Sequence, residues 1–181
     1  LVGRVVACGA NIGDESLIGR TVFTFSPHAS RVVVDIDAVQ IVPDGIDAED
    51  AIFMPSVETA LSLVHDAHVR LGENVAVFGQ GLIGLLVTAI LSMHHSSTIS
   101  SSRQFCSVTT FDALDDRLGM SSNIGATSAL HPPTAGIAGP VDVSIEVSGN
   151  PRALQSAIDN TSNNGRIIIG SWYGAADVAL K

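Results

Sequence analysis

The sequence predicts an α/β fold with a parallel β-sheet, preceded by a short segment made only of strands. Three observations support this prediction. From residue 72 onward short apolar runs alternate with helical patterns, a glycine-rich turn joins the first of these runs to a helix, and the first 42 residues alternate between strands and turns. Alternating strands and helices form a parallel sheet with right-handed crossovers. We place the domain boundary near residue 46, which gives domains at 1–46 and 47–181.

The N-terminal domain is expected to contain short strands, because its apolar runs are broken by turn residues such as glycine and proline. The strands are predicted at 1–9, 22–25, 31–34 and 39–42. Asp47 is a plausible N-cap for a short helix, since its side chain can accept a hydrogen bond from the first turn. A second helix is predicted from about residue 57 to 68.

The glycine-rich turn follows an apolar strand at 74–78 and opens a helix, in the pattern G-x-G-x-x-G. The first glycine permits a tight turn, the second lets a phosphate approach the backbone, and the third lets the helix pack closely on the strand. The helix start offers free N–H groups and the positive end of its dipole. The motif therefore predicts a Rossmann-type site for a dinucleotide, with a purely structural turn as the alternative. The candidate cofactor-binding residues are Gly79, Gln80, Gly81, Leu82, Ile83 and Gly84.

The remaining elements follow in the order that a Rossmann-type domain requires. They are predicted as a helix at 83–93, strand 107–111, helix 114–123, strands 128–130 and 141–147, helix 151–160 and strand 165–170. A serine-rich tract at 96–104 is expected to form a surface loop inserted between the first helix and the second strand.

An acidic residue at the end of the second strand is the usual partner of this glycine motif, because it accepts hydrogen bonds from the adenosine ribose. Asp112 occupies that place, 33 residues after Gly79. The usual spacing is about 20 residues, and the serine-rich tract accounts for the surplus. A carboxylate there favours NAD over NADP, although Arg117 nearby would weaken that preference. The alternative is that Asp112 only caps the next helix.

Ser148 and Gly149 follow the fourth strand, at the edge where open α/β sheets bind ligands, and are further candidate cofactor contacts. An ordinary turn into a helix that starts at Pro151 is the alternative, and both can hold together.

The composition excludes several classes of partner. The 181 residues include 9 basic and 18 acidic side chains, a net charge of −9, and no basic cluster that would bind nucleic acid. No apolar run is long enough to cross a membrane, and we expect a cytoplasmic protein. Cys8 and Cys106 are too few and too far apart for a disulfide framework, and each is expected to be a small core residue. The chain opens at Leu1 inside a strand pattern, so we expect it to be a fragment.

The chain resembles the medium-chain, zinc-type alcohol and polyol dehydrogenases over essentially its whole length. Residues 1–9 are similar to the strand that follows the Gly-His-Glu motif of this family, and 19–23 to its Gly-Asp-Arg-Val turn. Other similar segments are 29–34, 69–75, 118–126, 141–150 and 165–170. The resemblance implies a GroES-like catalytic domain, here partial, and a Rossmann domain that is truncated at its C-terminus. It also implies hydride transfer between NAD, or NADP, and a small alcohol or carbonyl compound.

The resemblance accounts for the zinc site only in part. The family takes two zinc ligands from the segment before Leu1 and a third at a place where this sequence has Pro55, which cannot bind a metal. Glu58 is the nearest carboxylate that could replace it, or it is only an acid favoured by the helix dipole. The resemblance also places Thr59 under the nicotinamide. Catalytic residues remain unassigned.

Three functions are therefore weighed. The first is a fragment of an NAD-dependent zinc-type dehydrogenase; the second, favoured by Pro55, is a zinc-free oxidoreductase similar to quinone reductases. The third is a dinucleotide-binding remnant without catalysis. An open sheet edge and uncovered apolar surface would also favour pairing with another copy, so a homo-oligomer is a further expectation.

Overall fold

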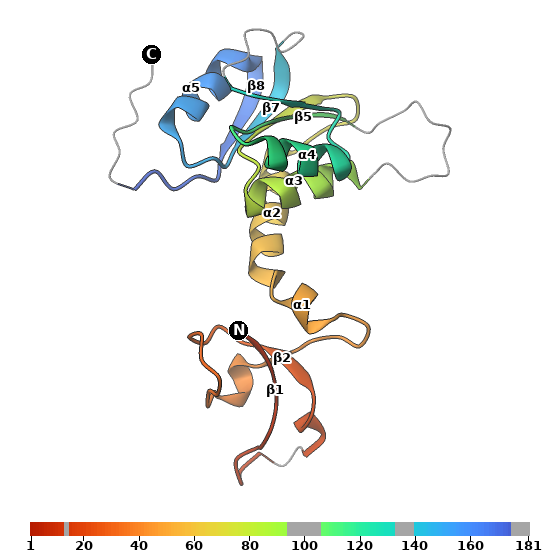
Figure 1. The fold of residues 1–181 in the computed structure, drawn as a ribbon, viewed down its shortest axis with the longest axis vertical. Helices are drawn as coiled ribbons and strands as arrows, with labels where there is room; N and C mark the ends of the chain where they lie inside the picture. Colours follow the sequence, from red (N-terminus) through yellow and green to blue (C-terminus); the bar gives the residue numbers. More distant parts are fainter. Residues whose placement is uncertain (13–14, 94–105, 133–139, 175–181) are drawn as a thin grey trace. The chain divides into compact units, whose positions relative to one another are not determined.

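The computed structural model describes residues 1–12, 15–93, 106–132 and 140–174 (Figure 1). The predicted serine-rich loop at 96–104 lies outside these residues. Contacts between Cα atoms divide the chain into two compact units, Leu1–Pro55 and Ser56–Lys181, and each unit is described by itself.

The first unit contains a small antiparallel sheet in the order β1-β2-β3. Its elements are β1 (Val2–Arg4), the 3-10 helix η1 (Glu15–Leu17), β2 (Thr21–Phe23), the 3-10 helix η2 (Ile36–Ala38), β3 (Gln40–Ile41) and α1 (Ala48–Ala51). Its small core consists of the buried side chains of Phe23, Val42 and Ala51, with Val2 and Met54 packed against them. Each strand holds only two or three residues, so this sheet buries little apolar surface.

The predicted strand at 31–34 is wrong. These residues form no strand, and the side chain of Val33 is fully exposed. The three strands of this sheet pair with one another, and the described part of the unit offers residues 31–34 no ladder partner. A β-branched run that finds no neighbouring strand gains nothing from its strand propensity.

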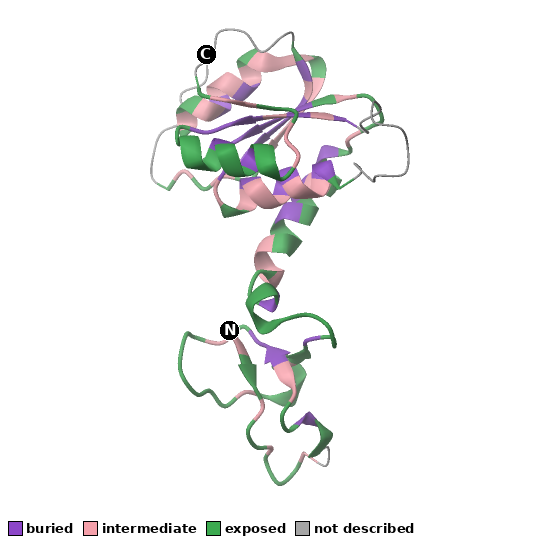
Figure 2. Ribbon diagram, turned by 45° about the vertical axis from the view of Figure 1, so that its right-hand side comes forward, coloured by how far each residue is buried: buried purple, intermediate pink, exposed green. Residues whose placement is uncertain are grey.

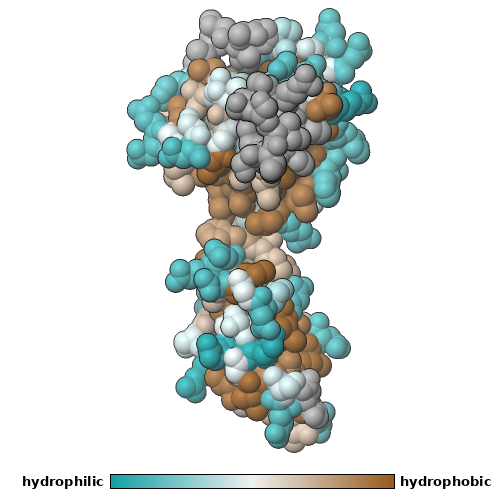
Figure 3. Space-filling view, turned by 90° about the vertical axis from the view of Figure 1, so that its right-hand side faces the viewer, coloured by the Kyte–Doolittle hydropathy of each residue, from teal (hydrophilic) through white to brown (hydrophobic). Residues whose placement is uncertain are grey.

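Apolar side chains are exposed on the first unit, and brown areas in the space-filling view show such surface (Figure 3). Val6 and Phe25 are 78% and 74% exposed. A cavity of about 540 Å³ opens beside Phe25 and is also lined by Val33, Val34 and Ala38. Exposed apolar area of this kind is typical of a surface that another part of a protein covers.

The described residues of the second unit form a parallel sheet of five strands, which confirms the predicted α/β fold class. The strands are β4 (Asn74–Phe78), β5 (Ser107–Phe111), β6 (Ser128–Leu130), β7 (Val141–Glu146) and β8 (Thr161–Ile169). Their spatial order is β6-β5-β4-β7-β8, so the chain moves outward from β4 in one direction and then returns to start β7 on its other side. The point between β4 and β7 is where open α/β sheets of this order bind ligands.

Within the described residues, four helices belong to this fold, and in Figure 2 the strands between them are the most buried part of the unit. They are α2 (Met54–Ala67), α3 (Leu82–Ser92), α4 (Asp115–Asn123) and α5 (Pro151–Asn160). Alternate residues of β4 point to opposite faces of the sheet. Val75 and Val77 therefore join a core with α2 and α3, whereas Ala76 and Phe78 join a second core with α5. In the part of the chain that is described, none of the helices has the length and apolar character needed to span a bilayer.

Strand β8 begins at Thr161, four residues before its predicted start. The pairing with β7 shifts register between Val141 and Val143, and Asn164 has a positive φ of 66°. Residues 161–164 therefore extend the strand through an irregular pairing, which the pattern of apolar and polar residues in the sequence does not predict.

One partly buried cluster ties β8 to the end of α2. Arg166 donates from Nε to the carbonyl of Ala67 at 2.8 Å and from Nη2 to Glu73 Oε2 at 2.5 Å. The Arg70 N–H donates to the same carboxylate oxygen at 2.7 Å. Burial by itself would raise the pKa of Glu73, but the hydrogen bonds from Arg70 and Arg166 outweigh it and hold the pKa below its ordinary value.

We predict that Glu73→Gln lowers the free energy of unfolding by about 1 kcal/mol at neutral pH, because it removes a charge-assisted hydrogen bond that is partly screened by water. A lowered pKa means that the carboxylate stabilises the fold above its ordinary value of 4.5, and that this stabilisation is lost as the pH falls through the folded-state pKa. Urea unfolding at a series of pH values should show wild type and variant converging in acid. An equal difference at every pH would contradict this account, and the exposed Asp66→Asn variant is the control that should lose no stability.

Candidate functional site

The glycine-rich turn lies at the centre of the sheet, between the end of β4 and the start of α3. Gly79 has a φ of +95° and donates its N–H to the carbonyl of Phe111 at 2.7 Å. A Cβ atom at this position would lie 2.6 Å from Cα of Ser148, the residue that follows the end of β7 by two positions. The turns after β4 and β7 thus approach so closely that neither the space nor the backbone conformation admits a side chain at Gly79.

The other two glycines differ from each other. A Cβ atom on Gly84 would lie 1.8 Å from the carbonyl oxygen of Gly79, so this glycine allows α3 to pack against the turn. Gly81 is the N-cap of α3, with an ordinary φ of −73°, and a Cβ atom there would meet nothing within 4 Å. Glycine has no side chain that could cap the helix, so the first N–H groups of α3 receive no hydrogen bond from the N-cap residue. Two glycines serve packing, and Gly81 alone borders free space.

Gln80 supports the turn from inside. Its side chain is fully buried, donates from Nε2 to the carbonyl of Gly79 at 3.1 Å, and accepts at Oε1 from the hydroxyl of Thr88 at 3.1 Å. The two remaining motif residues differ in burial: Leu82 is 49% exposed, whereas Ile83 packs against the core. The structure therefore places the Gln80 side chain in the scaffold beneath the turn.

Asp112 lies directly after β5 and joins the glycine turn. Its Oδ2 accepts the Gln80 N–H at 2.6 Å, and its Oδ1 accepts the Leu114 N–H at 3.0 Å. Arg117 Nη1 lies 3.6 Å from Oδ2, with 48% of its side chain exposed against 7% for the carboxylate. The N-cap of α4 is Leu114, so Asp112 holds the turn before the helix and the glycine turn together.

Glu146 is a residue of this site that the sequence reasoning missed. It is the last residue of β7, is fully buried, and accepts at Oε1 from the N–H and the hydroxyl of Ser148 at 2.8 and 2.5 Å. The hydroxyl of Tyr173 donates to Oε2. Burial first, and then this hydrogen bond, raise the pKa of Tyr173. In the sequence Glu146 alternates with Asp142 and Ser144 along the strand, a pattern typical of a polar sheet face, so no local signal marked this carboxylate as buried.

Gly149, the other candidate after β7, has a φ of +71°, and its N–H donates to Ser171 Oγ at 2.8 Å. The turn after β7 is therefore bonded both to Glu146 below it and to the segment that follows β8.

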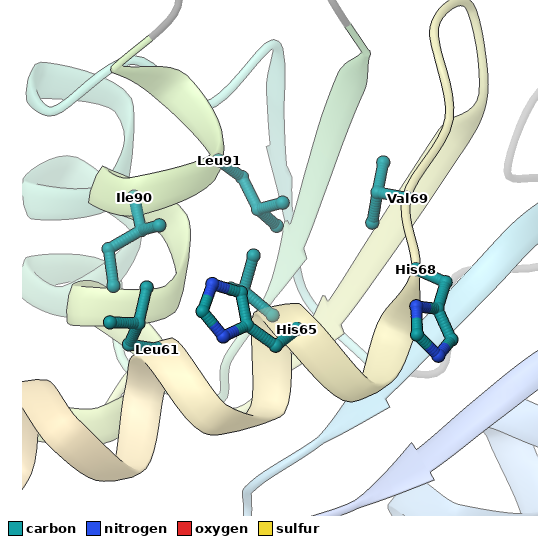
Figure 4. A pocket seen from close by; sticks show the side chains of 7 residues that line it. Leu61, His65, His68, Val69, Ile90 and Leu91 are labelled. Atoms are coloured by element: carbon teal, nitrogen blue, oxygen red, sulfur yellow. The ribbon is translucent and has the colours of Figure 1, made fainter.

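The remaining candidates are residues of α2. Glu58 and Thr59 are exposed residues of that helix. His65 and His68, which have a spacing found in metal sites, line a cavity of about 410 Å³ with apolar residues of α2 and α3. Figure 4 shows His65 directed toward Ile90 and His68 at the end of the helix. Within the described residues, no three His, Cys, Asp or Glu side chains come together as a metal site.

Cys106 is buried directly before β5, and its Sγ lies 3.9 Å from the carbonyl of Leu91. Burial, with a smaller contribution from Glu73, raises the pKa of this thiol. A thiol that stays protonated is a poor nucleophile, so Cys106 acts as a core residue.

The strand order, the glycine turn and the acid after β5 together define a Rossmann-type domain. No protein-family model matches the chain. The chain is 26% identical over 179 residues to D-guloside 3-dehydrogenase of Escherichia coli (strain K12), covering 92% of this chain and 48% of that protein. It is 33% identical over 181 residues to L-threonine 3-dehydrogenase of Streptomyces coelicolor, covering 92% of this chain and 47% of that protein.

Solved structures show the same fold. The 2R,3R-butanediol dehydrogenase of Bacillus subtilis matches with a TM-score of 0.73 and 24% identity, over 98% of this chain and 59% of that one. A short chain alcohol dehydrogenase of Escherichia coli, complexed with NADH, matches with a TM-score of 0.77 and 16% identity, over 99% and 61%. The relatives of this chain are alcohol and polyol dehydrogenases, which confirms the resemblance. The chain spans about half the length of the curated relatives it matches.

We predict that Gly84→Ala lowers the free energy of unfolding by at least about 2 kcal/mol, because the new methyl group overlaps the carbonyl of Gly79. The matched variant Gly81→Ala, on the same motif, should cost less than about 1 kcal/mol, since its methyl group enters open space. Denaturant unfolding of both variants measures the difference, and similar losses in the two would show that the turn is packed differently.

Proposed function

We propose that the second unit binds a dinucleotide, NAD, with its pyrophosphate against the turn at 79–84. The observation that carries this proposal is the contrast among the glycines: Gly79 and Gly84 are enclosed by protein atoms, whereas Gly81 borders free space at the start of an eleven-residue helix. Unsatisfied N–H groups and the helix dipole make that space suitable for an anion. Leu82, exposed in the first turn, would lie beside the ligand.

The adenosine ribose is proposed to lie at Asp112, next to the glycine turn. Each oxygen of this carboxylate already accepts one backbone N–H, but a carboxylate offers about four acceptor positions, so a ribose hydroxyl remains a possible donor. The negative charge would repel a 2′-phosphate and favours NAD. Arg117, half exposed beside the carboxylate, would attract a 2′-phosphate and so allow some binding of NADP.

The proposed activity is that of the relatives, hydride transfer between a small alcohol or carbonyl compound and the nicotinamide. When bound, the cofactor supplies the hydride chemistry, and the protein supplies binding and orientation. We propose that Ser148 and Gly149 lie beside the cofactor at the switch point of the sheet, and that Thr59 on α2 contacts the nicotinamide. The first unit is proposed to be part of a GroES-like catalytic domain, with a domain boundary near residue 46. Its exposed apolar residues support an assembly of several copies.

Zinc, which the resemblance implies, finds no complete set of ligands among the described residues, since that resemblance places two of the ligands before Leu1. The described part of the chain brings no three candidate ligands together, and Glu58 is an exposed residue of α2. Pro55, at the place of a family ligand, favours the second candidate function, a zinc-free oxidoreductase similar to quinone reductases. A dinucleotide-binding protein without catalysis would show the binding predicted below without turnover of any alcohol or quinone.

We predict that Gly81→Val abolishes NADH binding, a loss of at least about 100-fold in affinity, or 2.7 kcal/mol by the usual conversion. Its side chain would fill the space assigned to the phosphates while meeting no protein atom within 4 Å at Cβ. NADH fluorescence titration measures binding, and unfolding by urea confirms that the variant is folded. Unchanged affinity in a folded Gly81→Val protein would refute the assignment of the pyrophosphate site.

We predict that Asp112→Ala lowers the ratio of NADH to NADPH affinity about tenfold, because the charge that repels a 2′-phosphate is removed. Both affinities should also fall, since the variant frees the N–H of Gln80 that helps to hold the glycine turn. Asp116→Ala, an exposed acid in the first turn of α4, is the control that should leave the ratio unchanged. A constant ratio in Asp112→Ala would leave Asp112 with only its structural role.

A further inference from the structure

We propose that Glu146 is a positioning residue of the nucleotide site, a buried carboxylate that holds the turn after β7 and the segment after β8 beside the glycine turn. This inference rests on the proposed function, because it assigns to Glu146 the shaping of the same crevice. The carboxylate would act on the ligand only through the two backbone segments that it orders.

The first argument is the burial of the charge and the way its acceptor positions are used. Glu146 is fully buried, and within the described residues no cation forms an ion pair with it. Instead, the N–H and the hydroxyl of Ser148 donate to one oxygen, and the hydroxyl of Tyr173 donates to the other. A buried carboxylate is costly unless several donors satisfy it, so these three hydrogen bonds belong to one unit.

The second argument is where the three donors lie. Ser148 is the residue whose backbone abuts Gly79, so Glu146 holds the part of the β7 turn that touches the glycine turn. The hydroxyl of Ser148 accepts in turn from the N–H of Asn150 at 3.0 Å, and Asn150 caps α5. One carboxylate oxygen therefore orders the whole connection from β7 to α5.

The other oxygen anchors the chain after β8. Tyr173 lies 27 residues away in sequence, and its hydrogen bond brings the segment 171–173 back onto β7. The N–H of Gly170 donates to the Glu146 carbonyl at 2.9 Å, and Ser171 Oγ accepts from Gly149. These bonds leave Trp172 89% exposed, while its carbonyl lies 3.8 Å from the position of a Cβ on Gly149. The two segments bound by the Glu146 carboxylate, the turn after β7 and the chain after β8, thus lie at the same edge of the sheet.

The isosteric variant Glu146→Gln separates the two halves of this unit. The Ser148 N–H can only donate, so it selects the amide oxygen and leaves the amide NH₂ facing the Tyr173 hydroxyl. The charge is lost, the bonds to Ser148 become weaker neutral ones, and the bond from Tyr173 must reverse. Tyr173→Phe removes only the second half.

A first measurement reports on the unit without any ligand. Tyr173 is the single tyrosine of the chain, so tyrosinate absorbance titrates this residue alone. Burial and the hydrogen bond to Glu146 raise its pKa in the wild type. At about pH 11, one unit above the ordinary pKa, Glu146→Gln should show more tyrosinate than the wild type. Asp159→Asn, an exposed acid on α5, is the matched control and should titrate as the wild type does.

A second measurement tests the positioning role. Trp172 is the single tryptophan, so its fluorescence on addition of NADH reports binding. We expect the dissociation constant to rise about tenfold in Glu146→Gln and about threefold in Tyr173→Phe, with no change in Asp159→Asn. Far-ultraviolet circular dichroism and urea unfolding identify any variant that fails to fold, in which case Tyr173→Phe carries the test.

The outcomes distinguish this inference from the proposed function. If the wild type binds NADH, Gly81→Val does not, and Glu146→Gln and Tyr173→Phe bind as tightly as the wild type, the role of Glu146 is overturned and the nucleotide site stands. If the wild type itself binds neither NADH nor NADPH, the proposed function and this inference both fall. A Tyr173 pKa that is unchanged in folded Glu146→Gln would show that the carboxylate does not hold the segment after β8.

Discussion

The second unit depends on one close approach of backbone segments, where the turn after β4 meets both α3 and the turn after β7. A Cβ atom would collide at Gly79 with Ser148 and at Gly84 with the carbonyl of Gly79. The absence of two side chains lets three elements converge at the centre of the sheet. The start of α3 is consequently brought to the carboxyl edge of β4 and β7, with Gly81 facing free space.

Two carboxylates stabilise this convergence, although the proposed ligand is an anion. Asp112 accepts from the backbone of the glycine turn and Glu146 from the backbone of the β7 turn. Both are buried at the carboxyl ends of β5 and β7, the two strands that flank β4, where backbone N–H groups of the turns have no ladder partners. Both carboxylates thus accept hydrogen bonds from the turns, and the N–H groups at the start of α3 remain for the proposed ligand.

The elements of the second unit were predictable because their signals are local. A buried parallel strand shows as a continuous apolar run, and β4, β5 and β6 have the predicted bounds. The prediction of a strand at 31–34 was wrong, because its β-branched residues have strand propensity but no neighbouring strand among the described residues. β8 began early for the related reason that its first residues pair through a register shift. Strand pairing depends on partners that a single segment does not specify.

The amino-acid sequence by itself determined the order of the elements, the glycine turn and the place of Asp112, because each is a local pattern of apolar residues, glycines and turns. Only the tertiary structure decided that the Gln80 side chain supports the turn from within, and that Glu146 joins Ser148 to Tyr173. The physical reason is that both arrangements need burial and exact contacts between residues that the folded sheet brings together. A spacing of 27 residues between Glu146 and Tyr173 carries no periodic signal, and the hydrogen bond exists only once β7 and β8 are paired.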